Sequence, residues 1–216
     1  GLDRKQKSVQ TLENIENYES VFTGYDNYEE EAALLAIYKN GKETAVIEEG
    51  EEGILIFDRS PFYAESGGQV GDTGVGRSDR VFFEITDTKK APAGEQGAIL
   101  HYVKIKKGKL NKGEHINLSV DKERRRQIEI HHSSTHLLHH ALREVLGLHV
   151  KQAGSYVGPD KLRFDFTHFK ALSSEEIEKV EAIINRKIRE NSNVRPETLK
   201  YEQAIDKGAI AIFEEK

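Results

Sequence analysis

Five histidines occur within one ten-residue segment, and this side chain can bind a metal ion or carry a proton at neutral pH. They are His131, His132, His136, His139 and His140. His132 and His136 are four positions apart, so in a helix both rings lie on one face, where both can reach a single ion. Zinc is the predicted ion, because it binds neutral imidazole or thiolate. The same spacing also occurs in helices whose histidines only face solvent.

A tetrahedral zinc site needs four ligands, and this pair supplies two. The sequence contains no cysteine, so further ligands would be carboxylates or other histidines. Those other histidines are His101, His115, His149 and His168, and none of them shows a matching spacing. His136 and His140 are also four positions apart, so spacing alone does not select the pair.

Composition limits the class of protein. With 216 residues, of which 37% are hydrophobic and 32% charged, the chain is predicted to form one large or two small domains in water. No apolar run approaches the roughly 20 residues that a membrane span requires, and no signal peptide opens the chain. The absence of cysteine excludes disulfides and fits a cytoplasmic location. A chain that begins with glycine and lacks methionine is expected to be part of a longer polypeptide.

The charge distribution argues against binding nucleic acid by bulk electrostatics, because the net charge is −5 and phosphate binding needs a basic surface. Two local basic runs are present. Each is interpreted either as a solvated face or as a phosphate contact. They are Lys104, Lys106, Lys107, Lys109 and Lys112, and Arg124, Arg125 and Arg126.

The first part of the chain has the pattern of a small β-barrel. Residues 1–18 are mixed in charge and are predicted to be a linker or the end of a helix from an upstream domain. Leu34–Tyr38 and Thr44–Ile47 flank Asn40-Gly41, a strong hairpin signal. Further strands are predicted at Gly53–Phe57, Val81–Ile85, Ala98–Val103 and His115–Val120. Five or six strands at this spacing predict a closed barrel over residues 19–120.

Residues 121–216 are predicted to form a second domain. A helix runs from Asp121, a plausible N-cap, to Gly147, and a hairpin follows from His149 to Phe166 with its turn at residues 158–160. A second helix begins at Ser173, where Glu176 completes a capping box. It is expected to bury Ile177, Val180, Ile184 and Ile188 and to end within residues 191–196, before a strand or loop and a short helix. The fold class is therefore α+β, with the histidine helix packed on an antiparallel sheet.

A glycine-rich segment, Phe62–Gly74, interrupts the predicted barrel strands. Glycine lets the backbone approach a ligand closely, so Gly67, Gly68 and the neighbouring Gln69 are candidate substrate-binding residues. The alternative is a tight turn with a bulge. The two interpretations carry about equal weight.

Several of these motifs, in this order, resemble the editing region of the alanyl-tRNA synthetases. The resemblance covers residue 19 to the end, and it rests on the glycine-rich segment together with three further motifs. These are His-Ser-Ser-Thr-His-Leu-Leu at 132–138, Leu-Arg-Glu-Val-Leu-Gly-Leu-His-Val-Lys-Gln-Ala-Gly-Ser at 142–155, and Leu-Arg-Phe-Asp-Phe at 162–166. A set of separate motifs is far more specific than one histidine pair.

The resemblance implies hydrolysis of tRNA(Ala) that is mischarged with serine or glycine, with Zn²⁺ held by His132 and His136. The family completes its zinc site with a later Cys-x-x-x-His motif, which this sequence does not contain, so the site is expected to be half built. The family also has asparagine where this chain has His131. The implied partners are the mischarged tRNA, an upstream aminoacylation domain and a downstream C-terminal region.

Two residues are the candidate catalytic groups. Thr135, between the two predicted ligands, is expected to recognise the serine hydroxyl; the alternative is a helix threonine bonded to its own preceding turn. Gln152 is expected, by resemblance, to orient the substrate or the attacking water. Two other functions stay open: a free-standing deacylase that edits in trans, and a noncatalytic RNA-binding barrel module.

Overall fold

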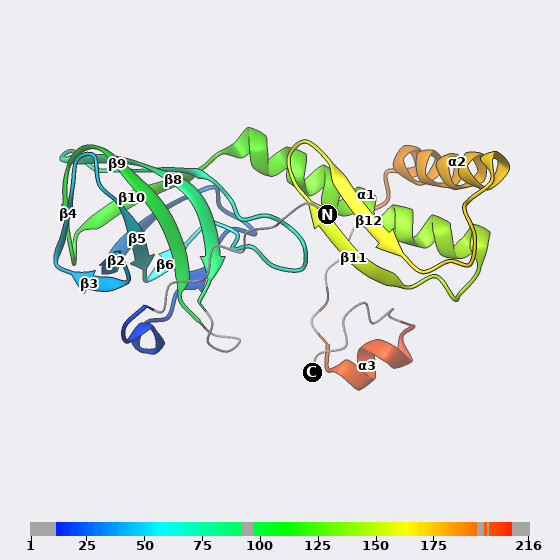
Figure 1. The fold of residues 1–216 in the computed structure, drawn as a ribbon, viewed down its shortest axis with the longest axis horizontal. Coiled ribbons are helices and arrows are strands. Elements are labelled where there is room, and N and C mark those ends of the chain that lie inside the picture. The colour runs from blue at the N-terminus through cyan, green and yellow to red at the C-terminus, as the bar shows by residue number, and fades with distance from the viewer. Residues whose placement is uncertain (1–11, 92–96, 194–196, 198, 209–216) are drawn as a thin grey trace. The chain divides into compact units, whose positions relative to one another are not determined.

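The computed structural model describes residues 12–91, 97–193, 197 and 199–208 (Figure 1). The chain divides into two compact units, Gly1–Ile128 and Glu129–Lys216, which we call the barrel unit and the second unit. The division lies inside the helix α1 (Lys122–Leu146), whereas the sequence pattern places the boundary near residue 120. The first turns of α1 therefore belong to the barrel unit.

Six antiparallel strands close into a barrel. The hydrogen-bonded order is β10-β7-β8-β9-β5-β2, and β2 pairs back with β10, so the circuit has no free edge. Closure confirms the predicted barrel. The strands are β2 (Glu29–Lys39), β5 (Glu52–Phe57), β7 (Gly74–Arg77), β8 (Val81–Lys90), β9 (Ile99–Asn111) and β10 (His115–Val120).

Four short strands complete the barrel unit. β3 (Lys42–Thr44) pairs with β2 and β4 (Val46–Glu48) pairs with β9. β1 (Val21–Phe22) and β6 (Arg59–Ser60) form a separate parallel pair. The predicted Asn40-Gly41 hairpin is confirmed, because both residues have positive φ, 51° and 82°, as a two-residue turn between right-twisted strands requires.

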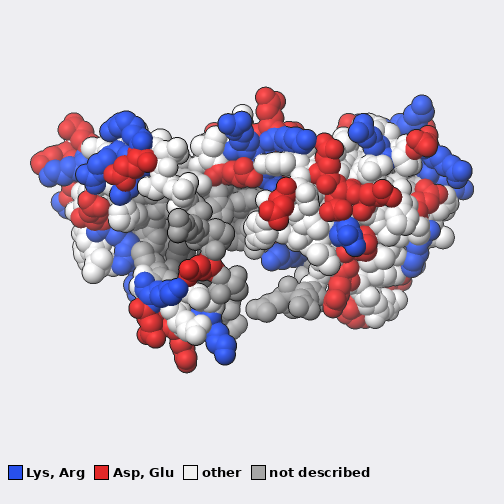
Figure 2. Space-filling model, turned by 180° about the vertical axis from the view of Figure 1, so that it is seen from behind, with Lys and Arg blue, Asp and Glu red and all other residues white. Residues whose placement is uncertain are grey.

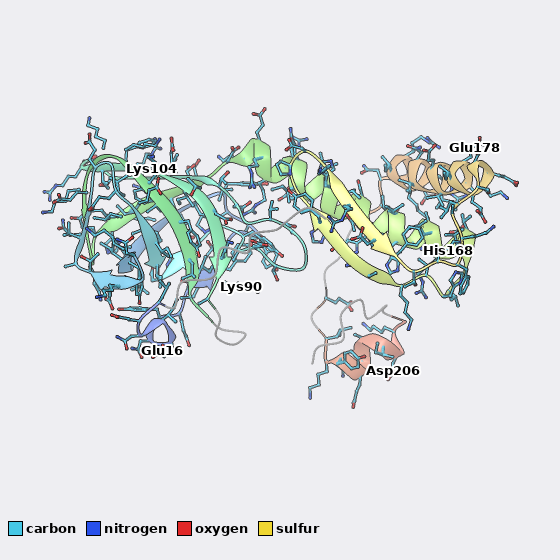
Figure 3. All side chains as sticks on the ribbon, viewed as in Figure 1. Glu16, Lys90, Lys104, His168, Glu178 and Asp206 are labelled. Atoms are coloured by element: carbon cyan, nitrogen blue, oxygen red, sulfur yellow. The ribbon has the colours of Figure 1, made fainter. Side chains whose placement is uncertain are left out.

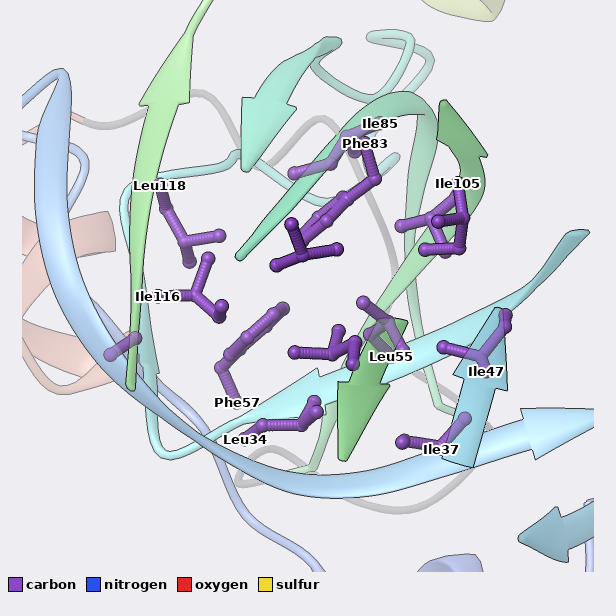
Figure 4. Packing of buried hydrophobic residues seen from close by; sticks show 14 of the residues in the cluster. Leu34, Ile37, Ile47, Leu55, Phe57, Phe83, Ile85, Ile105, Ile116 and Leu118 are labelled. Atoms are coloured by element: carbon purple, nitrogen blue, oxygen red, sulfur yellow. The ribbon is translucent and has the colours of Figure 1, made fainter. Parts of the chain in front are cut away.

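The barrel interior is filled by apolar side chains, most of them from β2, β5, β8, β9 and β10 (Figure 4). Alternation along β10 shows how the strands build it: Ile116, Leu118 and Val120 are buried, while the residues between them face outward. Phe57, Phe62 and Phe83 are fully buried. Burial of this many large side chains is the main force that stabilises the unit.

Residues 12–18 pack on the outside of the barrel, around a 3₁₀ turn at Ile15–Asn17. Leu12 is 6% exposed, and the hydroxyl of Tyr38 donates to the carbonyl of Glu13 at 2.8 Å. The hydroxyl of Tyr18 donates to Glu43 at 2.9 Å. This part of the predicted linker is therefore attached to the barrel; residues 1–11 lie outside the described residues.

The second unit contains the remainder of α1, the hairpin β11 (Gln152–Val157) and β12 (Leu162–Phe166), α2 (Ser174–Glu190) and α3 (Tyr201–Asp206). Its core is small: Ala141 and Leu142 from α1, with Val150 and Val180, are buried, and Phe164 and Phe166 of β12 pack against them. The predicted order of helix, hairpin and helix is confirmed, as is the capping box of Ser173 and Glu176.

The predicted apolar face of α2 is partly wrong. Val180 is buried and Ile184 packs on the core, but Ile177 and Ile188 are 44% and 55% exposed. Ile183 contacts the core instead, so only the middle of α2 packs, and its ends extend beyond the small hydrophobic cluster. The helix ends at Asn191, whose φ of 45° closes the last turn. Pro196 and residues 209–216 lie outside the described residues.

Within the described residues, no helix has the length and apolarity needed to cross a membrane.

Candidate functional site

α1 places His132 and His136 side by side. Their ring centroids are 5.1 Å apart, with the planes inclined by 39°, and both side chains are exposed. Partial desolvation lowers the pKa of His132, and repulsion from His136 lowers it further. Both effects favour the neutral imidazole, the form that binds a metal. As the four-residue spacing predicts, the two imidazoles lie on one accessible face of the helix.

The pair fits half of a zinc site. Among the described residues, no group of three or more histidine, cysteine or acidic side chains could hold a metal ion. Two neighbours are engaged elsewhere: Nδ1 of His131 lies 2.7 Å from the carbonyl oxygen of Gly158, and His140 lies 3.3 Å from Glu144. The described part of the chain thus offers two adjacent candidate ligands, His132 and His136.

His139 has a different environment from the other four histidines of the cluster. It is 5% exposed, and its ring contacts Phe164 of β12 with 5.2 Å between centroids. Burial lowers its pKa, opposed by a hydrogen bond to the backbone of Val150. Its role is to pack α1 onto the hairpin, and the sequence pattern does not distinguish it from the exposed histidines.

A second histidine pair forms at the far end of the hairpin. Nε2 of His149 and Nδ1 of His168 are 2.9 Å apart, and the two rings are stacked (His168 is labelled in Figure 3). The sequence pattern does not predict this contact, because the two histidines are nineteen positions apart and the β11–β12 pairing brings them together.

Thr135 is 8% exposed, and its hydroxyl donates to the carbonyl of His131 at 2.8 Å. This is the bond to the preceding helical turn that the sequence leaves as the alternative. The two interpretations are compatible. Once the hydroxyl hydrogen is donated, the oxygen still has acceptor capacity, so Thr135 can accept a hydrogen bond from a substrate hydroxyl.

Gln152 is the first residue of β11, beside a register shift between Gln152 and Gly154. Its side-chain nitrogen donates to the hydroxyl of Ser155 at 3.1 Å, which orients the amide. The side chain is only partly buried. An amide that carries both donor and acceptor and is held in this way can orient a polar substrate group.

The glycine-rich segment contains a tight turn. Ser66 and Gln69 exchange two backbone hydrogen bonds of 3.2 and 2.9 Å, and Gly67 and Gly68 between them have φ of 59° and 86°. Both glycines are exposed and Gln69 is buried. A side chain with a Cβ would be strained at both positions. These three residues belong to the barrel unit, and Thr135, Gln152 and the histidines belong to the second unit.

A buried ion pair supports the glycine-rich segment, and the sequence pattern does not predict it. Nε of Arg125 lies 3.0 and 2.8 Å from the two carboxylate oxygens of Asp72, and the side chains are 6% and 1% exposed. Arg125 also donates to the carbonyls of Gly24 and Pro61 at 3.0 and 2.9 Å. The backbone nitrogen of Tyr63 donates to Asp72 at 2.7 Å. Arg125, the middle residue of the basic run 124–126, therefore stabilises the fold.

Four lysines of the run at 104–112 pair with glutamates of other strands (Lys104 is labelled in Figure 3). The distances for Lys104–Glu52, Lys106–Glu84, Lys109–Glu48 and Lys112–Glu43 are 3.3, 2.8, 3.6 and 2.7 Å. Figure 2 shows basic and acidic side chains interspersed over the visible face. These pairings favour the solvated-face interpretation of the lysine run over the phosphate contact.

Comparison with known proteins gives two findings. Residues 2–124, which include the barrel strands, match the family described as tRNA synthetases class II (A). The chain is also 45% identical to the alanine–tRNA ligase of Methylococcus capsulatus over 197 residues, which are 90% of this chain and 22% of that protein. The corresponding ligases of Pseudomonas entomophila and Shewanella loihica are 46% and 44% identical, over 90% and 92% of the chain and 22% of each ligase. The chain thus spans about a fifth of these relatives.

Proposed function

The chain belongs to the family of class II (A) tRNA synthetases, and from that premise we propose that it carries an editing activity: hydrolysis of tRNA(Ala) mischarged with serine or glycine. The observation that carries the proposal is the pair of exposed imidazoles on one face of α1. Thr135, which lies between these two histidines in the sequence, is 8% exposed. The similarity to alanine–tRNA ligases over 90% of the chain supports the choice of tRNA.

A separate hydrolytic site answers a physical limit of amino-acid selection. A pocket that accepts alanine cannot exclude the smaller glycine, and it rejects serine by only about 10²-fold, because an added hydroxyl costs little in an apolar pocket. A site that hydrogen-bonds the serine hydroxyl discriminates more strongly, by roughly 10⁴-fold, because alanine leaves its buried polar group unpaired. Thr135 offers such an oxygen. Glycine has no hydroxyl that could bind this oxygen, so the removal of glycine must depend on other contacts.

The reaction needs little covalent help from the protein. Water adds to the ester carbonyl, the bond to the terminal ribose oxygen breaks, and that oxygen takes up the proton. Holding the ester and the water in reactive positions lowers the activation free energy by several kcal/mol, and by about 7 kcal/mol or more in the most favourable cases. In the proposed mechanism Thr135 binds the serine hydroxyl and Gln152, held by Ser155 at 3.1 Å, orients the ester or the water.

His132 and His136 are the residues that would hold Zn²⁺, because they are adjacent, exposed and, for His132, biased toward the neutral form. When bound, zinc supplies a Lewis acid that can anchor the amino group and ribose of the substrate or activate water. We favour anchoring. Because the described residues provide only two of the four ligands, the chain alone is expected to bind zinc weakly. Stoichiometric zinc that survives dialysis against a chelator would contradict this.

The test is deacylation of Ser-tRNA(Ala) and Gly-tRNA(Ala) by the full-length ligase that contains this sequence. We expect His132→Ala to abolish most of the hydrolysis of both substrates while aminoacylation with alanine is retained. His140→Ala is the matched control, since it removes an exposed histidine from the same helix, and it should leave both rates unchanged. Equal effects of the two substitutions, or full activity of His132→Ala, would refute the proposal.

A further inference from the structure

Two histidines close the open end of the hairpin β11–β12. His149 precedes β11 and His168 follows β12; Nε2 of His149 lies 2.9 Å from Nδ1 of His168, and the two rings are stacked. Phe169 stacks on the other ring of the pair, His149, with 4.7 Å between centroids. At 2.9 Å one nitrogen donates a hydrogen and the other accepts it, so the contact is a directional bond across the hairpin. We call this bonded pair the histidine clamp.

The bond to His149 is what a histidine contributes at position 168. Nε2 of His168 is buried, and among the described residues it has no hydrogen-bond partner. A phenylalanine would fill the space without burying an unpaired nitrogen, which destabilises a fold. In the described part of the chain, no third metal-binding side chain joins the pair. The histidine is therefore explained by the hydrogen bond of its Nδ1.

The clamp fixes the backbone immediately before Gln152. The backbone nitrogen of Thr167 donates to the carbonyl of Lys151 at 3.0 Å, and that of Lys151 donates to the hydroxyl of Thr167 at 3.1 Å. The same hydroxyl donates to the carbonyl of His149 at 3.1 Å. Backbone and side-chain bonds thus join the two chain segments at the open end of the hairpin, and Gln152 is the next residue.

Gln152 depends on this end of the hairpin, because a bulge separates it from the rest of β11. Gln152 pairs with Phe166 and Gly154 pairs with Asp165, so two steps along β11 correspond to one step along β12. A bulge interrupts the ladder and turns the strand locally. The regular pairing beyond the bulge therefore does not by itself fix Gln152, and the clamp holds it from the other side.

The clamped segment is also attached to α1, the helix that carries the histidine pair of the proposed site. Val150 is fully buried, and its carbonyl accepts a hydrogen bond from Arg143 of α1 at 3.3 Å. Gln152 follows two residues later, and its amide donates to Ser155 at 3.1 Å. The precision of such an attachment matters, because a displacement of about 1 Å in a group that orients a reactant can slow a reaction by roughly 10²-fold.

We propose that His149 and His168 are positioning residues of the editing reaction: their hydrogen bond holds the start of β11 so that the amide of Gln152 orients the ester or the attacking water. The inference rests on the proposed function for the role of Gln152. Neither histidine touches the substrate in this assignment; both act through Gln152.

A double-mutant cycle in the full-length ligase tests the assignment. His168→Leu and Gln152→Ala should each slow the hydrolysis of Ser-tRNA(Ala) and Gly-tRNA(Ala) by up to roughly 10²-fold, in kcat rather than in KM. Because His168 acts through Gln152, the double variant should be no slower than Gln152→Ala alone. Multiplication of the two factors in the double variant, or an unchanged rate in His168→Leu, would overturn the proposal.

His168→Asn separates the hydrogen bond from packing. An asparagine amide reaches nearly to the position of Nδ1 and can donate or accept, so this variant should keep the wild-type rate that leucine loses. His140→Leu makes the same replacement at an exposed histidine of the second unit, and it should leave the rate unchanged. An asparagine variant as slow as the leucine variant would overturn the role of the hydrogen bond.

Hydrogen exchange of the full-length ligase follows the clamp independently of activity. In His168→Leu the backbone amides of Lys151 and Thr167 should exchange faster by roughly two- to tenfold, the effect of one lost hydrogen bond. The amides of α2 should not change, which shows that the unit stays folded. Unchanged exchange at both amides would overturn the clamp. Absence of deacylation in the wild type would refute the proposed function and the role of Gln152 with it, whereas deacylation with multiplying factors refutes only the positioning role.

Discussion

The two units use their polar residues in opposite ways. In the barrel unit, two buried polar clusters have internal partners: Arg125 pairs with Asp72, and Nε2 of His101 lies 2.7 Å from the hydroxyl of Ser60. In the second unit the core is small, and His132 and His136 stand exposed on the helix beside it. The comparison shows that Arg125 and His101 maintain the structure of the barrel unit, whereas His132 and His136 remain accessible to solvent.

Among the substitutions considered, removal of Arg125 is expected to lower the stability most, because it leaves the Asp72 carboxylate buried without its counter-ion. Arg125→Ala should lower the free energy of unfolding of the barrel unit by about 3–5 kcal/mol. Denaturant unfolding followed by far-UV circular dichroism measures this. Arg126→Ala, at an exposed position one residue along, is the control and should cost less than about 0.5 kcal/mol. A similar loss of stability in both variants would mean that the buried ion pair stabilises the barrel unit no more than an exposed arginine does.

Acid should weaken the barrel through His101, which is fully buried between Phe57 and Phe62. Burial lowers its pKa to about 4, although a hydrogen bond to the backbone of Leu55 opposes the shift. The unfolded chain, with an ordinary pKa near 6.5, binds more protons between these values, so stability falls as the pH drops from about 6.5 to 4 and stays low below that. The loss is on the order of 3 kcal/mol.

The measurement is the stability of the wild type and of His101→Gln as a function of pH. The difference between the two curves should be flat above pH 7 and should shrink toward pH 4, because glutamine takes up no proton. A constant difference over the whole range would contradict the assignment of acid sensitivity to this histidine.

Thr135→Val tests whether the second unit recognises the serine hydroxyl. Valine keeps the shape and removes the oxygen, so hydrolysis of Ser-tRNA(Ala) by the full-length ligase should slow by roughly 5- to 100-fold, the cost of one lost hydrogen bond to a buried group. Hydrolysis of Gly-tRNA(Ala) should change little, since glycine has no hydroxyl. Thr135→Ser, which restores the oxygen, is the matched control. Equal loss for both substrates would make Thr135 a structural residue.

The smallest expected effect is at the start of α2. Ser173→Ala removes a side chain that accepts from the backbone of Glu176 at 3.2 Å, and it should cost about 1 kcal/mol. Ser174, the next residue, has no such cap, so Ser174→Ala should be nearly neutral. Thermal unfolding of the two variants compares them. A larger loss for Ser174→Ala would show that the small core, rather than the cap, limits the stability of the second unit.

Local patterns in the sequence were sufficient wherever a feature depends on neighbouring residues. The Asn40-Gly41 hairpin, the capping box at Ser173 and the helix that carries His132 and His136 follow from turn chemistry, capping and helical periodicity. The apolar face of α2 did not follow, because Ile177 and Ile188 have the right spacing but extend past a core too small to cover them.

The sequence by itself determined the closed barrel, the order of elements in the second unit and the side-by-side placement of His132 and His136, since these depend on periodicity and on spacings of a few residues. Only the tertiary structure decided which charges are paired and which rings are exposed. Arg125 and Asp72 are 53 residues apart, and Tyr25 is indistinguishable in sequence from a core tyrosine. Such contacts depend on how distant strands and helices meet, and local spacing contains no information about that.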